Sequence, residues 1–167
     1  MSTTTNKVRS GSNETSTASA RYEEDLYGWV EQQVALLKAG RLTEIDAGNI
    51  AEELSDVGGE QYDRLESSIR VVLLHLLKWD HQPERRSRSW MLSIAEHRRR
   101  VLRVLKKNPS LKSSLDEAVD EAYEDAKGDA WRETGLPGDT FARVCPYVWD
   151  EIMSRAIVFD DLQSPEQ

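Results

Sequence analysis

The chain has 167 residues, of which 38% are hydrophobic and 31% are charged, and its formal net charge at neutral pH is -8. This length favours one domain with a buried core over two ordinary domains. The acidic balance excludes a general binder of polyanions, although it allows a local basic patch.

Both ends of the chain are expected to lie outside the folded domain. Residues 1–20 are mostly Ser, Thr and small residues, which bury too little apolar surface to offset the entropy of ordering, so the sequence predicts a disordered tail there. The folded domain is predicted over residues 21–160, followed by a short tail at 161–167. Residues 1–20 also lack the apolar core of a secretory signal, and Cys145 is the single cysteine, so a cytoplasmic location is expected.

Apolar residues recur at helical spacing from residue 21 onward. The first stripe predicts a helix over 21–39, which Gly40 ends as a left-handed cap residue. A second helix is predicted after a cap at Thr43 or Asp46. The pair Gly58–Gly59 predicts a break or a kink in that helix.

The next helix is predicted to be the central and most buried one. From Tyr62 to Trp79 the apolar residues alternate three and four positions apart, and further apolar residues widen the same face. The longest apolar run, residues 71–74, is far shorter than the roughly 18 residues that a membrane-spanning helix needs. No membrane span is therefore expected.

Three more helices complete the predicted fold. Ser87 or Ser89 caps a helix that stops at Asn108–Pro109, and Ser110 opens another that runs to about Glu133. A last helix is predicted to start at Pro146, because proline suits the first helical turn. Since no segment requires a strand, the sequence predicts an all-α fold, a single bundle of five to six helices.

The segment HLLKWDHQPERRSRSW, residues 75–90, forms the corner between the central helix and the next one. Packing explains Trp79 and Trp90 better than a ligand role. His75 interrupts the most apolar stretch of the chain, so a helical His75 needs a polar partner. A hydrogen-bonded core histidine is favoured, with a catalytic base or a metal ligand as the alternative.

Two other charged residues are candidate partners of His75. Glu53 lies on the preceding helix among apolar neighbours, and Arg98 lies on the inner stripe of the helix that follows the corner. A charge in such a position needs a partner. The sequence therefore predicts a polar cluster of Glu53, His75 and Arg98, close to Trp79 and Trp90.

Several motifs resemble a bacterial family catalogued as domain of unknown function twenty-nine, over roughly residues 22–160. They are YEEDLYGWV, EIDAGNIAEELSDVG, HLLKWDHQPERRSRSW, NPSL and CPY. The resemblance implies an all-helical domain with no established biochemical activity. The residues that match recurrent family positions are Trp29, Glu52, Glu53, His75, Trp79, Pro83, Trp90, Arg98 and Pro146. His81 and His97 depart from the pattern, which argues against a site of three histidines.

An enzymatic alternative uses Arg70 and His75. Their spacing resembles the ribonuclease motif of the helical HEPN families, in which an arginine and a histidine of one helix act on RNA phosphodiesters. The signal is weak, because arginine is frequent in this chain and Val71 replaces the polar residue that commonly follows the arginine. A metal site of Glu52 or Glu53 with His75 has still less support, because no ligand signature fixes the spacing. No glycine-rich phosphate loop is present either, so no cofactor is expected.

Two consecutive helices carry opposite charge. Residues 84–107 hold nine basic residues against two acidic ones, and residues 116–133 hold eight acidic residues against two basic ones. A helical hairpin whose surfaces attract each other is the simplest interpretation. A nucleic-acid patch led by Arg85, Arg86 and Arg88 is the less favoured one.

Taken together, these features favour a non-enzymatic binding or interaction module, with a helical ribonuclease of the toxin or defence type as the alternative. The sequence allows a protein partner and also a nucleic acid, although a nucleic acid is not favoured. The sequence indicates no particular oligomeric state.

Overall fold

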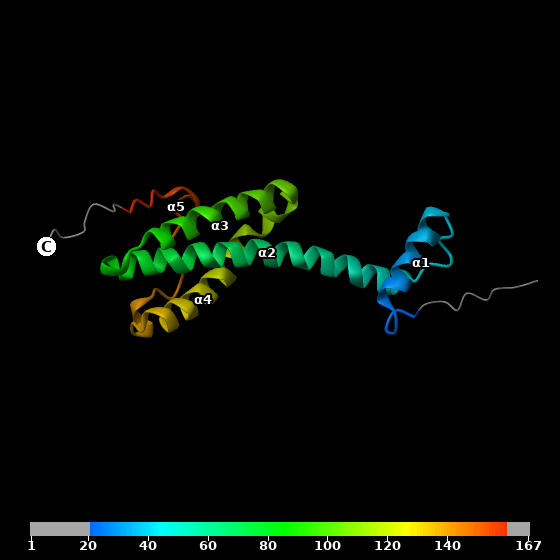
Figure 1. Ribbon diagram of the computed structural model, residues 1–167, viewed down its shortest axis with the longest axis horizontal. Helices are drawn as coiled ribbons and strands as arrows, with labels where there is room; N and C mark the ends of the chain where they lie inside the picture. The colour runs from blue at the N-terminus through cyan, green and yellow to red at the C-terminus, as the bar shows by residue number, and fades with distance from the viewer. Residues whose placement is uncertain (1–20, 160–167) are drawn as a thin grey trace, which may run out of the picture. The chain divides into compact units, whose positions relative to one another are not determined.

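The computed structural model describes residues 21–159, which form five α-helices, three short 3-10 turns and no strand (Figure 1). The predicted all-α class and number of helices are confirmed for this part of the chain. The tails predicted at 1–20 and 161–167 lie outside the described residues. Sequence analysis predicts one domain over 21–160, whereas the contacts divide the chain into two compact units, with the division between Glu53 and Leu54. We call them the N-terminal unit and the C-terminal unit and describe each by itself.

The N-terminal unit contains α1 (Leu26–Lys38) and the first turns of α2 (Ala47–His81). Asp25 caps α1, because its carboxylate accepts a hydrogen bond from the Gly28 amide at 2.9 Å. After α1 ends, Gly40 adopts a φ of 70°, a left-handed conformation that glycine tolerates best. The sequence analysis predicts this stop correctly.

The helix α2 runs without interruption through Gly58–Gly59, so of the predicted break or kink at this pair the break is wrong. Glycine lowers helix stability by about 1 kcal/mol relative to alanine, but it has no steric barrier to helical dihedral angles. The buried face that begins at Leu65 stabilises the helix beyond the glycines. This buried stretch confirms the prediction of a central helix.

The C-terminal unit places the rest of α2 between α3 (Arg88–Lys107) and α4 (Leu115–Thr134) in the view of Figure 1. The turns η1 (Pro83–Arg85) and η2 (Pro109–Ser114) make the two corners. The core is built from leucine, isoleucine and valine of α2 and α3, from alanines and Tyr123 of α4, and from Ile152 of α5. Its largest fully buried side chains are Tyr123, Leu65, Ile69, Leu73, Leu76, Leu77, Ile94, Ile152, Val72 and Val101.

After α4 the chain passes through η3 (Gly138–Thr140) to the short helix α5 (Trp149–Ser154), which begins later than the predicted start at Pro146. Arg155, the residue after α5, forms a bidentate ion pair with Asp80 at 2.6 and 2.8 Å. Asp80 also accepts a hydrogen bond from the Tyr147 hydroxyl at 2.8 Å. These contacts fasten the C-terminal segment to the end of α2.

The same segment contains Cys145, the single cysteine of the chain. Its Sγ donates to the Tyr147 carbonyl oxygen at 3.5 Å, and the residue packs against the hydrophobic core. Burial raises the pKa of this thiol.

The acidic residues of α4 pair with α2. Asp129 lies 2.6 Å from Arg70 and Glu133 lies 2.5 Å from Lys78. On α3, Arg99 pairs with Glu96 of its own helix at 2.6 Å. The prediction that α3 cations face α4 carboxylates is therefore wrong in its pairing, because the described α4 carboxylates pair with cations of α2 and with Lys127 and Arg132 of α4 itself.

Candidate functional site

Trp79 and Trp90, the tryptophans of the corner, pack as predicted, and Lys78 lies against the Trp90 ring. Trp79 is buried, and Trp90 meets the ring of His75 edge to face with 6.5 Å between centroids. The Nζ atom of Lys78 lies 4.5 Å from the Trp90 ring centroid and 2.5 Å from Glu133. The role of Lys78 could not be predicted from the sequence, because its partners Glu133 and Trp90 lie in other helices.

His75 bonds within its own helix. Its Nδ1 atom lies 2.9 Å from the Val71 carbonyl oxygen, one turn earlier in α2. Burial lowers the pKa of His75, although the hydrogen bond to Val71 opposes that shift. The imidazole is therefore neutral at pH 7, as suits the structural interpretation.

The other two members of the predicted cluster have different partners. Glu53 belongs to the N-terminal unit and accepts a hydrogen bond from the Tyr22 hydroxyl at 2.7 Å. Arg98 donates to the carbonyl oxygens of Ile152, Arg155 and Glu151 at 2.7, 2.8 and 3.1 Å. Among the described residues, no hydrogen bond or ion pair joins Glu53, His75 and Arg98 to one another. Arg98 instead satisfies the open carbonyls at the end of α5, which a sequence pattern could not reveal.

Arg70 and His75, the pair of the ribonuclease alternative, contact side chains of two different helices. The guanidinium of Arg70 contacts Asp129 and Asp125 of α4 at 2.6 and 3.4 Å. His75 instead contacts Trp90 of α3. Two carboxylates of α4 therefore offset the charge of Arg70.

The arginines of the predicted nucleic-acid patch also differ in role. Arg86 donates to the Trp79 carbonyl oxygen at 2.9 Å, and its guanidinium lies 5.1 Å from the Trp79 ring centroid. Arg86 therefore closes the end of α2. Arg85 and Arg88 are exposed.

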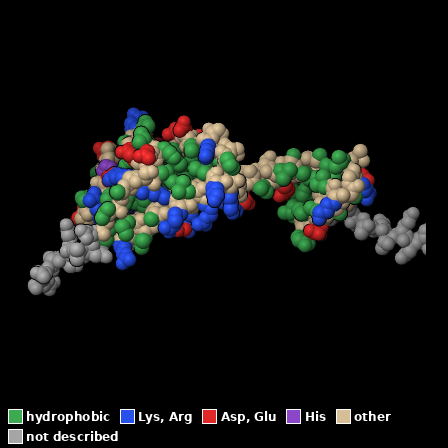
Figure 2. All heavy atoms as spheres, turned by 90° about the horizontal axis from the view of Figure 1, so that it is seen from above, with side chains coloured by type: hydrophobic (Ala, Val, Ile, Leu, Met, Phe, Trp, Pro, Cys, Tyr) green, Lys and Arg blue, Asp and Glu red, His purple; other side chains and the backbone are tan. Residues whose placement is uncertain are grey.

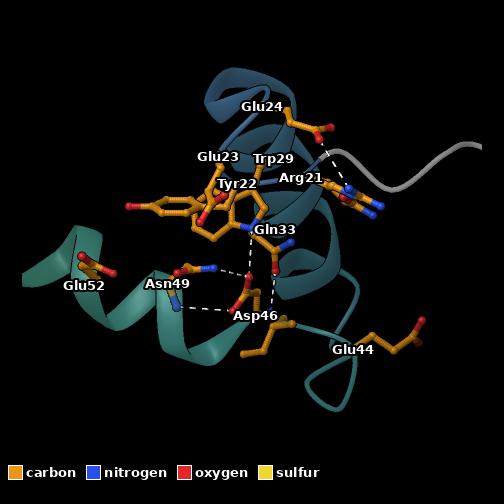
Figure 3. A pocket seen from close by; sticks show the side chains of 12 residues that line it. Arg21, Tyr22, Glu23, Glu24, Trp29, Gln33, Glu44, Asp46, Asn49 and Glu52 are labelled. Atoms are coloured by element: carbon orange, nitrogen blue, oxygen red, sulfur yellow. Dashed lines mark hydrogen bonds and ion pairs between the residues drawn. The ribbon is translucent and has the colours of Figure 1, made fainter.

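A different site, which the sequence analysis does not identify, lies in the N-terminal unit. It is an open pocket of about 780 Å³ between the segment before α1, α1 itself and the start of α2 (Figure 3). We call it the N-terminal pocket. Its lining residues are Arg21, Tyr22, Glu23, Glu24, Trp29, Gln32, Gln33, Glu44, Ile45, Asp46, Asn49 and Glu52.

Asp46 organises this pocket. Its carboxylate accepts hydrogen bonds from the Asn49 side chain at 2.7 Å, the Asn49 amide at 3.3 Å and the Trp29 indole at 3.4 Å (Figure 3). Its own amide donates to the buried Gln33 side chain at 2.8 Å. The predicted cap of α2 at Asp46 is thus present, and the same carboxylate fixes α1 through Trp29.

The electrostatics of the pocket are acidic. Hydrogen bonds from Asn49, with a smaller contribution from Trp29, lower the pKa of Asp46, so this carboxylate is ionised at neutral pH. Glu23 and Glu52 also line the pocket, and neither makes a hydrogen bond or an ion pair with another described residue. Arg21 is the one basic residue among the described lining residues, and it pairs with Glu24 at 3.3 Å.

The pocket walls are fixed by aromatic contacts. The rings of Tyr22 and Trp29 meet edge to face with 4.9 Å between centroids. The Tyr22 hydroxyl reaches Glu53 on α2, so this tyrosine ties the segment before α1 to the next helix. The site is therefore an open acidic recess in which Glu23 and Glu52 lack partners among the described residues, an arrangement that attracts a cation.

The described residues contain no group of three or more His, Cys, Asp or Glu side chains placed to share a metal ion. In the same part of the chain, no helix is both long and apolar enough to span a bilayer.

Comparison with known proteins gives one family. The sequence model of the family described as "Domain of unknown function DUF29" matches residues 21–158. No curated protein and no solved structure matches the chain significantly.

Proposed function

The chain therefore belongs to the DUF29 family, and since this membership assigns no activity, we propose that the protein is a binding module whose N-terminal pocket takes a lysine or arginine side chain of a protein partner. The observation that carries this proposal is the charge of the lining. Among the described residues, five carboxylates line the pocket, namely those of Glu23, Glu24, Glu44, Asp46 and Glu52. Arg21 pairs with Glu24 and Arg41 pairs with Glu44, which leaves Glu23, Asp46 and Glu52 without a described basic partner.

The unpaired carboxylates give the site its preference for a cation. Glu23 and Glu52 come from different segments and lack partners among the described residues. Carboxylates that share a recess repel one another, and a bound cation removes that repulsion. Asp46 contributes fixed negative charge, because Asn49 and Trp29 hold it in place.

The nature of the lining favours a protein partner over a small organic ligand. Small-molecule pockets are lined mainly by apolar and aromatic side chains, whereas the N-terminal pocket is lined mainly by charged and amide side chains. Polar groups of this kind are typical of the outer part of a protein interface, and arginine is enriched among the residues that contribute most to such interfaces.

The test uses a fluorescein-labelled tri-arginine peptide, with a tri-glutamate peptide as the charge control, and measures fluorescence anisotropy on the full chain. We expect saturable binding of the tri-arginine peptide alone. Replacing Glu23→Gln together with Glu52→Gln should weaken it by about tenfold, because a charge-assisted contact contributes about 1.5 kcal/mol or more.

The matched control is the pair Glu31→Gln and Asp56→Asn, which removes the same charge from exposed positions outside the pocket. An equal loss of affinity in the two double variants would mean that general electrostatic attraction, and not the pocket, holds the peptide. That result, or the absence of saturable binding, would overturn the proposal.

A further inference from the structure

A second pocket lies in the C-terminal unit, between α2 and α3. Its volume is about 440 Å³. The residues that line it are Gln61, Arg64, Ser67, Ser68, Glu96, Arg100, Arg103, Val104 and Lys107. Figure 2 looks down on the α3 side of Figure 1, and Lys and Arg side chains gather there on the C-terminal unit. We call this site the basic pocket.

The basic pocket concentrates positive charge in an acidic protein. Four cationic side chains line it, whereas Glu96 is the one acidic lining residue. Glu96 is shared, because it pairs with Arg100 at 3.1 Å and with Arg99 at 2.6 Å. Arg103 and Lys107 make no hydrogen bond or ion pair with another described residue. The positive charge inside the pocket is therefore only partly neutralised.

Neutral donors lie beside these cations. Asn108 donates its side-chain amide to the Gln61 oxygen at 3.5 Å, which leaves the Gln61 amino group free to donate. Ser67 is exposed and lines the pocket with its hydroxyl. Ser68 is buried and bonds the Arg64 carbonyl oxygen at 2.8 Å, so it fixes the floor. Guanidinium, ammonium, amide and hydroxyl donors together match the oxygens of phosphate groups.

We propose that the basic pocket binds a chain of phosphates, as a free di- or triphosphate or as the phosphate tail of a nucleotide. A compact anion fits better than a nucleic-acid backbone for an electrostatic reason. The whole chain carries a net charge of -8, so a long polyanion would be repelled by the protein as a whole beyond the basic pocket. A compact ligand keeps its charge within about 8 Å, the screening length at physiological salt.

This proposal is independent of the one for the N-terminal pocket, since the two pockets share no residue. The experiment is calorimetric titration of the full chain with inorganic triphosphate at 0.15 M salt. We expect saturable binding of one triphosphate per chain. The double variant Arg103→Gln and Lys107→Gln should lose at least about tenfold in affinity, because each removed cation takes away charge-assisted hydrogen bonds.

The control is the double variant Arg88→Gln and Lys106→Gln, which removes the same charge from exposed positions of the same helix outside the pocket. It should lose less than about threefold, since screened surface charges contribute little. Equal losses in the two double variants would show that the anion follows the general field of α3, and this would overturn the proposal. Absence of saturable binding to the unmodified chain would overturn it as well.

Two further titrations identify the source of the phosphates. A nucleoside triphosphate that binds as well as inorganic triphosphate would assign the site to the phosphate chain alone, and one that binds more tightly would add a contact to the nucleoside. Both results support the proposal. Single-stranded RNA that binds through Arg103 and Lys107 while triphosphate fails to bind would overturn it in favour of a nucleic-acid surface.

Discussion

The contact between Arg98 and the end of α5 allows a quantitative prediction. Arg98→Ala removes three hydrogen bonds, two of them in partly buried surroundings, to Ile152 at 2.7 Å and to Arg155 at 2.8 Å. The third, to Glu151 at 3.1 Å, is exposed and contributes little. Hydrogen bonds from a charged donor contribute about 1.5–3 kcal/mol each, but carbonyls at a helix end regain part of this from water. We therefore expect Arg98→Ala to lower the free energy of unfolding by about 2–3 kcal/mol.

The assay is urea unfolding followed by circular dichroism, combined with amide hydrogen exchange. The control is Arg99→Ala, which loses one exposed pair with Glu96 and should change the free energy of unfolding by about 0.5 kcal/mol or less. In Arg98→Ala, the amides of α5 should exchange faster than those of α2, because the lost contacts are local. An Arg98→Ala protein as stable as the Arg99→Ala protein, with unchanged exchange in α5, would refute this account of the contact.

Three more predictions concern single contacts. Burial lowers the pKa of His75 below its ordinary value of 6.5, so the unfolded chain binds this proton at a higher pH than the folded chain does. The stability that His75 contributes is complete above pH 6.5 and is lost as the pH falls below that value. His75→Gln should flatten this pH dependence in urea midpoints measured from pH 7 to 5. Tyr22→Phe removes the hydrogen bond to Glu53 and should speed amide exchange in α1, with a local loss of about 0.5–1.5 kcal/mol and unchanged exchange in α4. Arg70→Ala leaves Asp129, whose side chain is only 13% exposed, without its α2 partner. This change should destabilise the C-terminal unit by about 1–3 kcal/mol in urea unfolding. A ribonuclease role for Arg70 would instead give unchanged stability and lost RNA cleavage.

The sequence predicts a helix end well where a residue at that end itself caps or stops the helix. Asp46 and Ser87 are side chains that cap α2 and α3, and Gly40 ends the chain's first helical segment with a positive φ. Gly58–Gly59 misleads, because glycine is compatible with a helix, and whether the helix continues depends on packing further along α2. The division between Glu53 and Leu54 has no sequence signal at all, since it lies inside a continuous helix.

The partners of charged residues are the part that the sequence could not predict. His75 is identified as a residue in need of a hydrogen bond, and its partner is a backbone carbonyl of the same helix, which any helix could offer. Arg98 donates to backbone carbonyl oxygens far along the chain, and every residue has such a carbonyl, so the sequence does not identify these partners. The N-terminal pocket is missed for a related reason: Glu23 and Glu52 acquire meaning only when folding brings the segment before α1 beside α2.

The burial of Cys145 has a practical consequence. A thiol attacks alkylating reagents as its thiolate, and burial raises the pKa of Cys145, so modification near neutral pH is slowed in the folded protein. Because the chain has one cysteine, every modified molecule carries its label at the same atom. The ratio of labelling rates in the native and the urea-unfolded chain therefore measures how strongly the fold protects this half-buried thiol, without any engineered probe.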